Sequence, residues 1–413
     1  MNKLPDFLTQ ILASLNRRSI DLSQPSVLQL NDMLCMPLTS LATDRLQMQG
    51  GLYSKTGQYI PLSGLITSQQ TIVGDGHLPL PNSAPSLAGK SLYLGVCHYH
   101  FGHFLIETCS RLWSLKPDEI KQFDHIILMT LTDYVPEFAM DLFKLLGVEE
   151  HIRIIKEPLF LDQVTLPAPA IEYPYHVYQV INKIQHLFTN HHNTALKNQA
   201  IFLSRSRLVP GHSRVIIGED LIEQALQHQG VTIFHPQQHS LAEQITTLRQ
   251  YKTVISFAGS ALHTLILTGG NKQVIAYSAR KIPVIFPKLD KALNNQAHYL
   301  RSELNCVKPG MAELPVGFKP QLIDPRIILK KLKQQKIISS DALPNYGSKT
   351  AHEKELSRYN TALLLRWVLE ASQQQSNDNC QTFIKTFSQK YPLDETILAQ
   401  AKNGSALMRT FFN

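Results

Sequence analysis

Two hydrophobic patterns alternate along the central part of the chain. Short apolar runs, of the kind buried in parallel sheets, are each followed by a stretch with apolar residues at helical spacing. Strands that alternate with helices in this way indicate parallel, doubly wound α/β structure. The first series predicts strands at 91–97, 125–130 and 152–155, and helices at 101–115 and 135–146.

The same alternation restarts near residue 200 and predicts a second Rossmann-like domain. Ser240 precedes an apolar-periodic stretch and Glu243 follows three residues later, which is the pattern of a capping box at the start of a helix. A polar-ended helix over 178–199 would bridge the two domains. The series predicts strands at 200–204, 231–234, 253–257 and 273–277, and helices at 220–229, 241–250 and 261–267.

The two ends of the chain are less regular. Short strand-like runs alternate with glycine and proline turns over the first ninety residues, and the stretch 339–348 is a polar linker. Beyond residue 350, Leu356, Tyr359, Leu363 and Trp367 recur at helical spacing. We therefore expect an α/β domain at 1–190, a Rossmann-like domain at 191–338, and a linker with a helical extension at 339–413.

The composition is that of a globular protein, with 43% hydrophobic and 17% charged residues, which excludes disordered and collagen-like chains. The formal net charge of +8 favours anionic partners: nucleic acid, phosphorylated small molecules or an acidic membrane surface. The five cysteines are widely spaced without a C-x-x-C pair, so reduced, buried thiols are expected. Neither a spanning apolar stretch nor a secretory signal pattern is found, so a cytoplasmic protein is expected.

Two common nucleotide-binding signatures are incomplete. The pair Gly74 and Gly76 lacks the third glycine of G-x-G-x-x-G, because Pro79 stands at that position. The Gly89-Lys-Ser91 sequence has Ala84 at the first glycine position of a P-loop, and a strand follows it. These departures weaken dehydrogenase-like and kinase-like interpretations.

A less stereotyped phosphate site follows the strand that ends at Phe257. Small residues, among them Gly259, Ser260 and Ala261, lead into a helix that also carries His263. Small side chains there let backbone N–H groups approach an anion at the positive end of the helix. Close helix–sheet packing explains the same residues equally well, so both interpretations stay open.

Arginines leave the carboxyl end of the strand at 200–204. Arg205 and Arg207 come first, Arg214 follows, and Glu219 opens the next helix. Guanidinium groups suit phosphate oxygens, and ligands of open α/β sheets bind beyond the carboxyl ends of strands. Any one of these arginines could simply lie in a solvated loop. However, the strands at 200–204 and 253–257 both end in residues suited to bind anions, which favours a phosphorylated ligand.

The densest cluster of ionisable groups lies between residues 98 and 111. On a helix that starts near Phe101, His103, Glu107 and Arg111 share one face, with His100 one turn earlier. A carboxylate beside a histidine fixes its tautomer and raises its basicity, as a general base requires. A structural ion pair and a metal site remain alternatives, although the H-E-x-x-H order is absent.

At these residues the sequence resembles glycosyltransferase family 61. The histidine-centred segment with Glu107 and Arg111 is similar to the family's aromatic-x-His-Trp-Leu-x-Glu/Asp segment followed by Arg. The 202–205 stretch, with Arg214 and Glu219, is similar to its Ser-Arg and Arg-x-x-x-Asn-Glu motifs. Residues 241–263 resemble its last motif, in the Gly-Ser-Ala-Leu-His form of bacterial members. The chain departs from the family pattern at Phe104, Gly218, Ala258 and Thr264.

The resemblance implies a GT-B-like α/β fold with two Rossmann-like domains facing a cleft. It implies an inverting, metal-independent glycosyltransferase without a cofactor, which moves a sugar from a nucleotide-diphosphate donor to a bacterial capsular or surface polysaccharide. It also implies roles for the residues above: His103 and Glu107 in catalysis; Arg205, Arg207, Arg214, Glu219, Gly259, Ser260 and His263 in donor binding; His98, His100 and Arg111 in acceptor binding.

Other functions stay open on the same residues. A nucleotide-sugar epimerase, a phosphotransferase and a non-catalytic assembly subunit would all fit the predicted fold. Nucleic acid is not an expected partner, because the basic run Lys330–Lys333 with Lys336 has no interleaved aromatic residues. Peripheral contact with the inner face of the membrane, or with capsule assembly proteins, is left open by the positive charge.

Overall fold

The computed structural model describes most of the chain. The described residues are 20–21, 24–41, 44–66, 71–74, 80–81, 83–130, 134–172, 176–188, 197–208, 216–217, 219–278, 282–301, 321–322, 325–341, 357–358, 360–361, 364–365, 368, 377–390, 392–404, 409 and 411.

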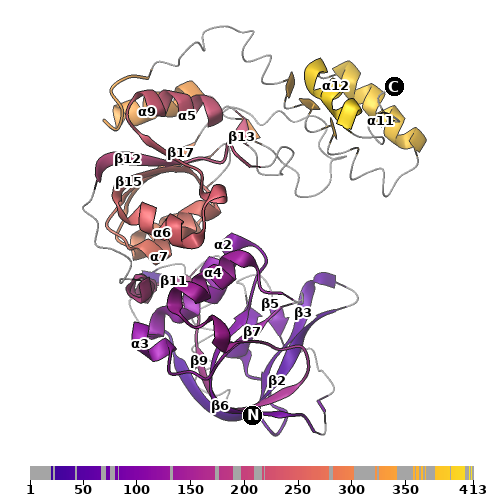
Figure 1. Cartoon of the computed structure of the whole chain (residues 1–413), viewed down its shortest axis with the longest axis vertical. Coiled ribbons are helices and arrows are strands. Elements are labelled where there is room, and N and C mark those ends of the chain that lie inside the picture. Colours follow the sequence, from indigo (N-terminus) through magenta and orange to yellow (C-terminus); the bar gives the residue numbers. More distant parts are fainter. Residues whose placement is uncertain are drawn as a thin grey trace, which may run out of the picture. The chain divides into compact units, whose positions relative to one another are not determined.

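Strands and helices of the described residues form a mixed α/β fold (Figure 1). An eight-stranded sheet has the order β4-β5-β3-β2-β9-β6-β7-β8, and a five-stranded sheet has the order β14-β12-β15-β16-β17. The alternation of strands and helices predicted from the sequence is confirmed. The facing-cleft arrangement of two domains stays a prediction.

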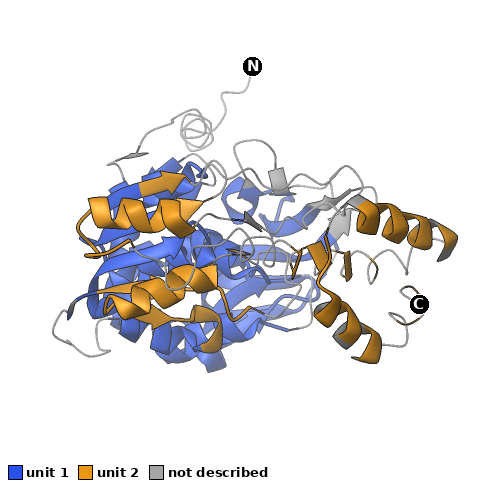
Figure 2. Cartoon of the chain, turned by 90° about the horizontal axis from the view of Figure 1, so that it is seen from above, with its two compact units in different colours: residues 1–199, 239–276, 282–298 blue, residues 200–238, 277–281, 299–413 orange. Residues whose placement is uncertain are grey.

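By its internal contacts the chain divides into two compact units, coloured separately in Figure 2. Unit 1 comprises residues 1–199, 239–276 and 282–298, and unit 2 comprises residues 200–238, 277–281 and 299–413. Each unit therefore combines segments that are distant in the sequence. The predicted domain boundaries at residues 190 and 338 stay predictions.

The large sheet of unit 1 is built around strand β6. Residues 91–95 of β6 are buried, as expected for an apolar strand covered on both faces. Strands β7 and β9 run parallel to β6 on its two sides, whereas β2 runs antiparallel to both β3 and β9. The strands of this sheet are β2 Val27–Leu41, β3 Asp44–Tyr53, β4 Leu65–Ile66, β5 Thr71–Gly74, β6 Ser86–Val96, β7 His125–Met129, β8 Ile152–Ile154 and β9 Leu159–Pro167. A separate three-stranded sheet consists of β1 Ile20–Asp21, β10 Ile171–Glu172 and β11 His176–Tyr178.

The helix predicted over 101–115 is not a single α-helix. One α-helical turn, α2 (Phe101–His103), passes into a π-helix, η2 (Phe104–Thr108), and then into a 3-10 helix, η3 (Cys109–Ser114). Nearly every side chain of η2 and η3 is buried, so one amphipathic face cannot describe the element. Tertiary packing, rather than helix propensity, determines its form.

The helix predicted at 135–146 is confirmed as α4 (Glu137–Leu146). Its buried residues recur at helical spacing, and Gly147 ends it in the left-handed conformation with φ 65°. The shorter elements of this part are η1 Pro61–Ser63, α3 Pro117–Ile120, η4 Glu149–His151 and η5 Gln179–Phe188. The helix η5 confirms helical structure over 179–188 of the bridge predicted at 178–199. The predicted polar end at 190–193 lies outside the described residues, and residues 197–199 belong to strand β12 instead.

Residues 239–276 and 282–298 of unit 1 begin with helix α6 (Leu241–Arg249). The Ser240 side chain accepts from the Glu243 backbone N–H and the Glu243 side chain accepts from the Ser240 backbone N–H, which confirms the capping box. The predicted 261–267 helix is a 3-10 turn followed by one α-helical turn. The following elements are β15 Tyr251–Phe257, η7 Ser260–Thr264, α7 Leu265–Thr268, β16 Gln273–Ser278, α8 Ile285–Ala292 and β17 Gln296–Arg301. The last residues of β16 and β17, 277–278 and 299–301, are assigned to unit 2.

Unit 2 contains a strand–helix–strand repeat. Strand β12 (Lys197–Leu203) pairs in parallel with β14 (Thr232–Phe234), and α5 (Glu219–His228) lies between them in the sequence. Its other elements are β13 Ile216–Ile217, η6 Pro236–Gln238, β18 Gln321–Leu322, α9 Pro325–Gln334, α11 Asn377–Lys390 and α12 Glu395–Gly404. Helices α11 and α12 confirm a helical C-terminal region. No helix among the described residues has both the length and the apolar character needed to cross a bilayer.

Four of the five cysteines lie within the described residues, and all four are buried free thiols: Cys35, Cys97, Cys109 and Cys380. Burial raises the pKa of the Cys97 thiol to about 12. These cysteines therefore pack as small apolar side chains.

Candidate active site

The histidine segment, residues 98–108, follows the carboxyl end of β6 in unit 1. The Thr108 hydroxyl donates to the Val96 carbonyl at 2.5 Å, which ties the π-helix back to the strand. Rings of Phe101 and Phe104 pack on Phe138 of α4, at 5.4 and 5.5 Å between centroids. Figure 1 shows α2 beside α4. A π-helical turn is uncommon in proteins and is frequently found at functional sites.

Glu107 lies between two imidazole rings. Its Oε1 is 2.8 Å from His103 Nδ1, and its Oε2 forms an ion pair with His98 Nε2. Burial opposes ionisation of Glu107, but hydrogen bonds from His103 and His98 outweigh it and lower its pKa to about 2. Glu107 is therefore a buried carboxylate at neutral pH. The spacing of four residues predicted the His103 contact, whereas His98 was expected to bind the acceptor.

The two histidines differ in exposure. The His98 side chain is 15% exposed, whereas that of His103 is 43% exposed, with only 5% for Glu107. When a carboxylate accepts the Nδ1 proton of a neutral imidazole, the lone pair of that ring lies on Nε2, so His103 Nε2 is the basic nitrogen. Among the described residues, no three His, Cys, Asp or Glu side chains converge as metal ligands do. The arrangement is that of a partly exposed imidazole oriented by a buried carboxylate.

An exposed aromatic pair lies next to His103. The rings of Tyr99 and His100 are 4.3 Å apart between centroids, and the His100 ring is 6.1 Å from that of His103. Tyr99 is 64% exposed and is among the most exposed large apolar side chains of the described residues. The predicted acceptor residue His100 is thus exposed beside the candidate base.

The structure brings the predicted donor segment against the histidine segment. A β-carbon built on Gly102 would stand 2.6 Å from Ser260 Oγ and 3.4 Å from His263 Cδ2, so α2 and η7 are in direct contact. His263 is buried and its ring stacks on Phe286 at 4.9 Å. The small residues near Gly259 therefore permit close approach of these two elements, a use that neither sequence interpretation foresaw.

Arg111 is a buried cross-link within unit 1. Its guanidinium donates to the carbonyls of Pro167, Leu62 and Gly64 at 2.6, 3.0 and 3.3 Å. Burial lowers the pKa of Arg111 to about 10, so it stays charged at neutral pH. Helical spacing placed Arg111 on the same face as His103 and Glu107, whereas its side chain is directed to these main-chain carbonyls. The structure thus gives Arg111 a stabilising role, and its acceptor contact stays a prediction.

The arginine turn, residues 204–208, follows β12 in unit 2. The Arg205 backbone N–H donates to Glu219 Oε2 at 3.0 Å, and the Tyr277 hydroxyl donates to Glu219 Oε1 at 2.8 Å. Burial raises the pKa of Glu219 to about 7, against the lowering effect of the Arg205 charge and these hydrogen bonds. Glu219 therefore links the backbone of the arginine turn to the Tyr277 hydroxyl through its two carboxylate oxygens.

Arg207 is exposed, and Arg214 lies outside the described residues. Sequence reasoning missed Glu223, which accepts hydrogen bonds from the hydroxyls of Ser204 and Ser206. Its spacing of four residues from Glu219 on α5 was a signal that both carboxylates share one helix face.

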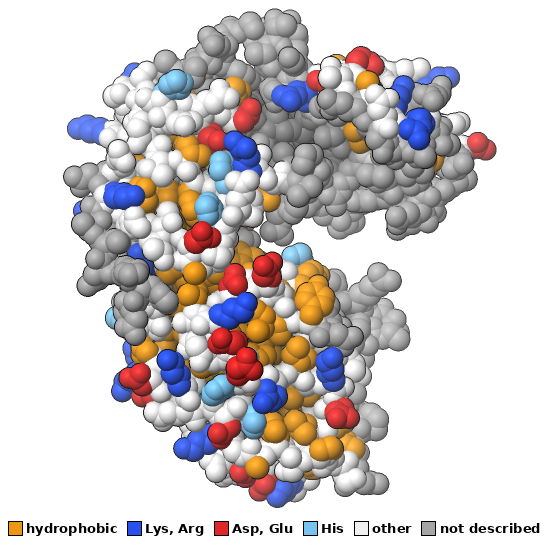
Figure 3. Space-filling model, viewed as in Figure 1, with side chains coloured by type: hydrophobic (Ala, Val, Ile, Leu, Met, Phe, Trp, Pro, Cys, Tyr) orange, Lys and Arg blue, Asp and Glu red, His pale blue; other side chains and the backbone are white. Residues whose placement is uncertain are grey.

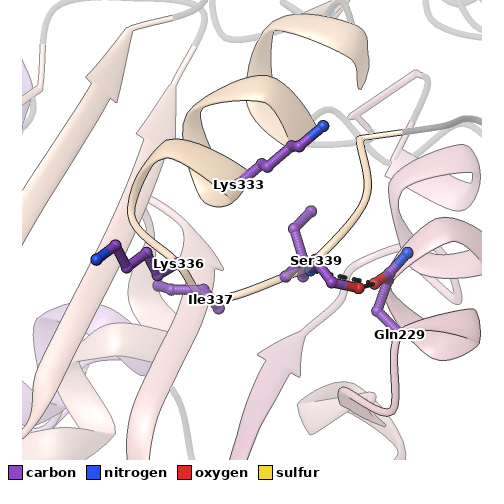
Figure 4. A pocket seen from close by; sticks show the side chains of 6 residues that line it. Gln229, Lys333, Lys336, Ile337 and Ser339 are labelled. Atoms are coloured by element: carbon purple, nitrogen blue, oxygen red, sulfur yellow. Dashed lines mark hydrogen bonds between the residues drawn. The ribbon is translucent and has the colours of Figure 1, made fainter.

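The basic run at the end of α9 lies at a shallow pocket of about 530 Å³ in unit 2. Figure 4 shows Lys333 and Lys336 at this pocket, with the Ser339 hydroxyl bonded to Gln229 at 2.7 Å. Lys333 also pairs with Asp341 at 2.7 Å. None of the residues assigned to donor, acceptor or catalysis lines this pocket.

Comparison with known proteins gives one finding. A family model described as Glycosyltransferase 61 matches residues 101–275. The match begins at the first residue of α2 and extends into β16, so it covers both the histidine segment from Phe101 onward and the arginine turn. No curated protein matches the chain.

Proposed function

Residues 101–275 belong to glycosyltransferase family 61, and on that premise we propose an inverting sugar transfer with His103 as the general base. The donor is a nucleotide-diphosphate sugar, and the acceptor is a hydroxyl group of an oligosaccharide or polysaccharide. The observation that carries the proposal is the exposed His103 ring held by the buried Glu107 carboxylate.

The base acts on the acceptor in a single displacement. His103 Nε2 takes the proton of the acceptor hydroxyl while that oxygen attacks the anomeric carbon of the donor. The bond from that carbon to the diphosphate breaks, and the configuration inverts. Glu107 stabilises the imidazolium that forms, because its carboxylate already accepts from Nδ1. His98 keeps Glu107 ionised, and His100 contacts the acceptor.

The donor side of the proposal uses the anionic leaving group. Arg205, Arg207 and Arg214 neutralise the developing charge on the diphosphate, as guanidinium groups do for phosphates. Ser260 and His263 shape the site beside α2, which agrees with the contact of η7 with Gly102. Glu219 contributes indirectly, through the backbone of Arg205.

Nucleic acid is a weaker candidate partner. On the face drawn in Figure 3, Lys and Arg side chains are interspersed with Asp and Glu rather than gathered into one basic patch. A basic patch or stripe is the usual electrostatic footprint of a nucleic-acid-binding protein. We propose instead that the net charge of +8 favours the anionic donor, with contact at the inner membrane face as an added consequence.

Donor binding is tested first with UDP, GDP and CDP, each added separately. A bound nucleotide raises the apparent melting temperature by mass action. We expect a rise with at least one of the three, diminished in Arg205→Ala. A flat response to all three would contradict the donor assignment.

Transfer is tested next with nucleotide-diphosphate sugars of the nucleotide that binds, each carrying a radiolabelled sugar. His103→Ala is expected to keep the nucleotide shift and lose about 100- to 10,000-fold in turnover. His228→Ala, an exposed histidine of α5, is the matched control and should change neither. Unchanged turnover in His103→Ala, or a product with retained configuration, would contradict the mechanism. An epimerised donor or a transferred phosphate would identify the two alternative reactions.

A further inference from the structure

Two carboxylates of α5 hold the arginine turn from one side. Glu223 Oε2 accepts from the hydroxyls of Ser204 and Ser206, at 2.8 and 2.6 Å. Glu219 Oε2 accepts from the Arg205 backbone N–H at 3.0 Å. Three consecutive residues of the turn are therefore fixed by two side chains that are four residues apart on one helix.

The same carboxylates are anchored at their other oxygens. Glu223 Oε1 lies 3.5 Å from Nε2 of His235, directly after β14. Glu219 Oε1 accepts from the Tyr277 hydroxyl, near the end of β16. The backbone N–H of Ser206 also donates to the Ser204 hydroxyl at 3.1 Å. Turn, helix and two strand ends thus form one hydrogen-bonded network within unit 2.

These carboxylates are poorly suited to bind a ligand themselves. Glu219 is fully buried, and the Glu223 side chain is only 16% exposed. Their oxygens already accept hydrogen bonds from the turn and from the Tyr277 hydroxyl. Their arrangement is that of residues that fix the shape of a loop in advance of binding.

We propose that Glu223 is a positioning residue, which pre-orders the Ser204–Arg205–Ser206 backbone so that the arginine side chains meet an anionic diphosphate. This inference rests on the proposed donor role of Arg205. A turn that is ordered before binding avoids the conformational entropy cost of ordering it during binding. Without Glu223, the turn must be ordered during binding, and the affinity for the diphosphate is lower.

The test compares Glu223→Ala, Glu223→Gln and the exposed control Gln224→Ala on the full chain. Inorganic pyrophosphate is the first probe, since every nucleotide-diphosphate donor contains that group, and UDP, GDP and CDP follow. The measurements are the dissociation constant by calorimetry, turnover at saturating donor, and amide hydrogen exchange over residues 204–208.

We expect Glu223→Ala to weaken binding by about tenfold and to speed amide exchange at residues 205 and 206. Turnover at saturating donor should change by less than about twofold, because Glu223 does not contact reacting atoms. Glu223→Gln should retain most of the affinity, since its amide oxygen still accepts from both serine hydroxyls. Gln224→Ala should match the wild type in every measurement.

Three results would overturn the proposal in distinguishable ways. If the wild type binds the probes and Glu223→Ala binds them equally well, or exchanges its turn amides no faster, the positioning role is wrong while the donor assignment stands. If the wild type binds none of the probes, the donor assignment fails and the positioning role fails with it. A lower melting temperature with an unchanged dissociation constant would identify a purely structural residue and overturn the proposal.

Discussion

Gly102 and Ser260 lie so close that a β-carbon at position 102 would stand 2.6 Å from the serine hydroxyl oxygen. The two residues come from α2 and η7, which are far apart in the sequence and belong to the same compact unit. Because Gly102 directly precedes His103, this contact sets where the candidate base stands relative to the Ser260–His263 segment.

Gly102→Ala should separate α2 from η7. A shift of about 1 Å in a reacting group can cost about 100-fold in rate, so we expect turnover to fall by at least about tenfold. The double variant Gly102→Ala with Ser260→Gly removes both Ser260 atoms that the new methyl group would meet. Initial rates of transfer are measured for both variants and for Ser260→Gly, which gives the loss due to the serine itself. Gly102→Ala should cost less activity in the Ser260→Gly background than in the wild type, and an equal cost in both backgrounds would exclude steric contact as the cause.

Glu107→Gln should change how stability depends on pH. The folded-state pKa of Glu107 is about 2, against an ordinary value of 4.5. The carboxylate therefore contributes stability that is fully present above about pH 4.5 and is lost as the pH falls toward 2. The contribution is at most about 3–4 kcal/mol, because each pKa unit corresponds to about 1.4 kcal/mol.

The measurement is the melting temperature of wild type and Glu107→Gln between about pH 3 and pH 7. The advantage of the wild type should be constant above about pH 5 and should shrink below it. An advantage that grows on acidification would mean that Glu107 is protonated in the folded state. The same variant should also lose turnover at neutral pH, since His103 loses its charged partner.

Arg111→Met separates a stabilising role from an acceptor-binding role. The change leaves three main-chain carbonyls without their donor, and each unsatisfied buried group costs about 1–3 kcal/mol. We expect unfolding in urea to show a loss of at least about 3 kcal/mol. Full stability with a raised KM for the acceptor would instead support the contact predicted from the sequence.

Local spacing predicted those parts of the site that one helix or one strand determines. His103 and Glu107 are four residues apart and meet as expected, even though the element changes from α- to π-helical between them. The capping box at Ser240 needs only residues 240–243. The buried strand β6 needs only its own apolar run.

Contacts between distant segments could not be obtained in this way. The Glu107 partner His98 precedes the helix, where no periodicity applies, and the carbonyls that hold Arg111 lie about 50 residues away in either direction. The close approach of Gly102 to Ser260 depends on how α2 and η7 pack. Among these contacts, only that of Glu223 could have been predicted, because Glu223 is four residues from Glu219 and lies on the same face of α5.

The interrupted course of unit 1 also bears on how the protein is made. The ribosome delivers the histidine segment first, and residues 239–276 of the same unit emerge only after residues 200–238. At about 5–20 residues per second, Ser260 follows Gly102 by roughly 10–30 s. A nascent chain that stops before residue 239 has the α4 surface on which the histidine segment packs but lacks η7. The contact of Gly102 with Ser260, which places His103 relative to η7, therefore forms only when translation is well advanced.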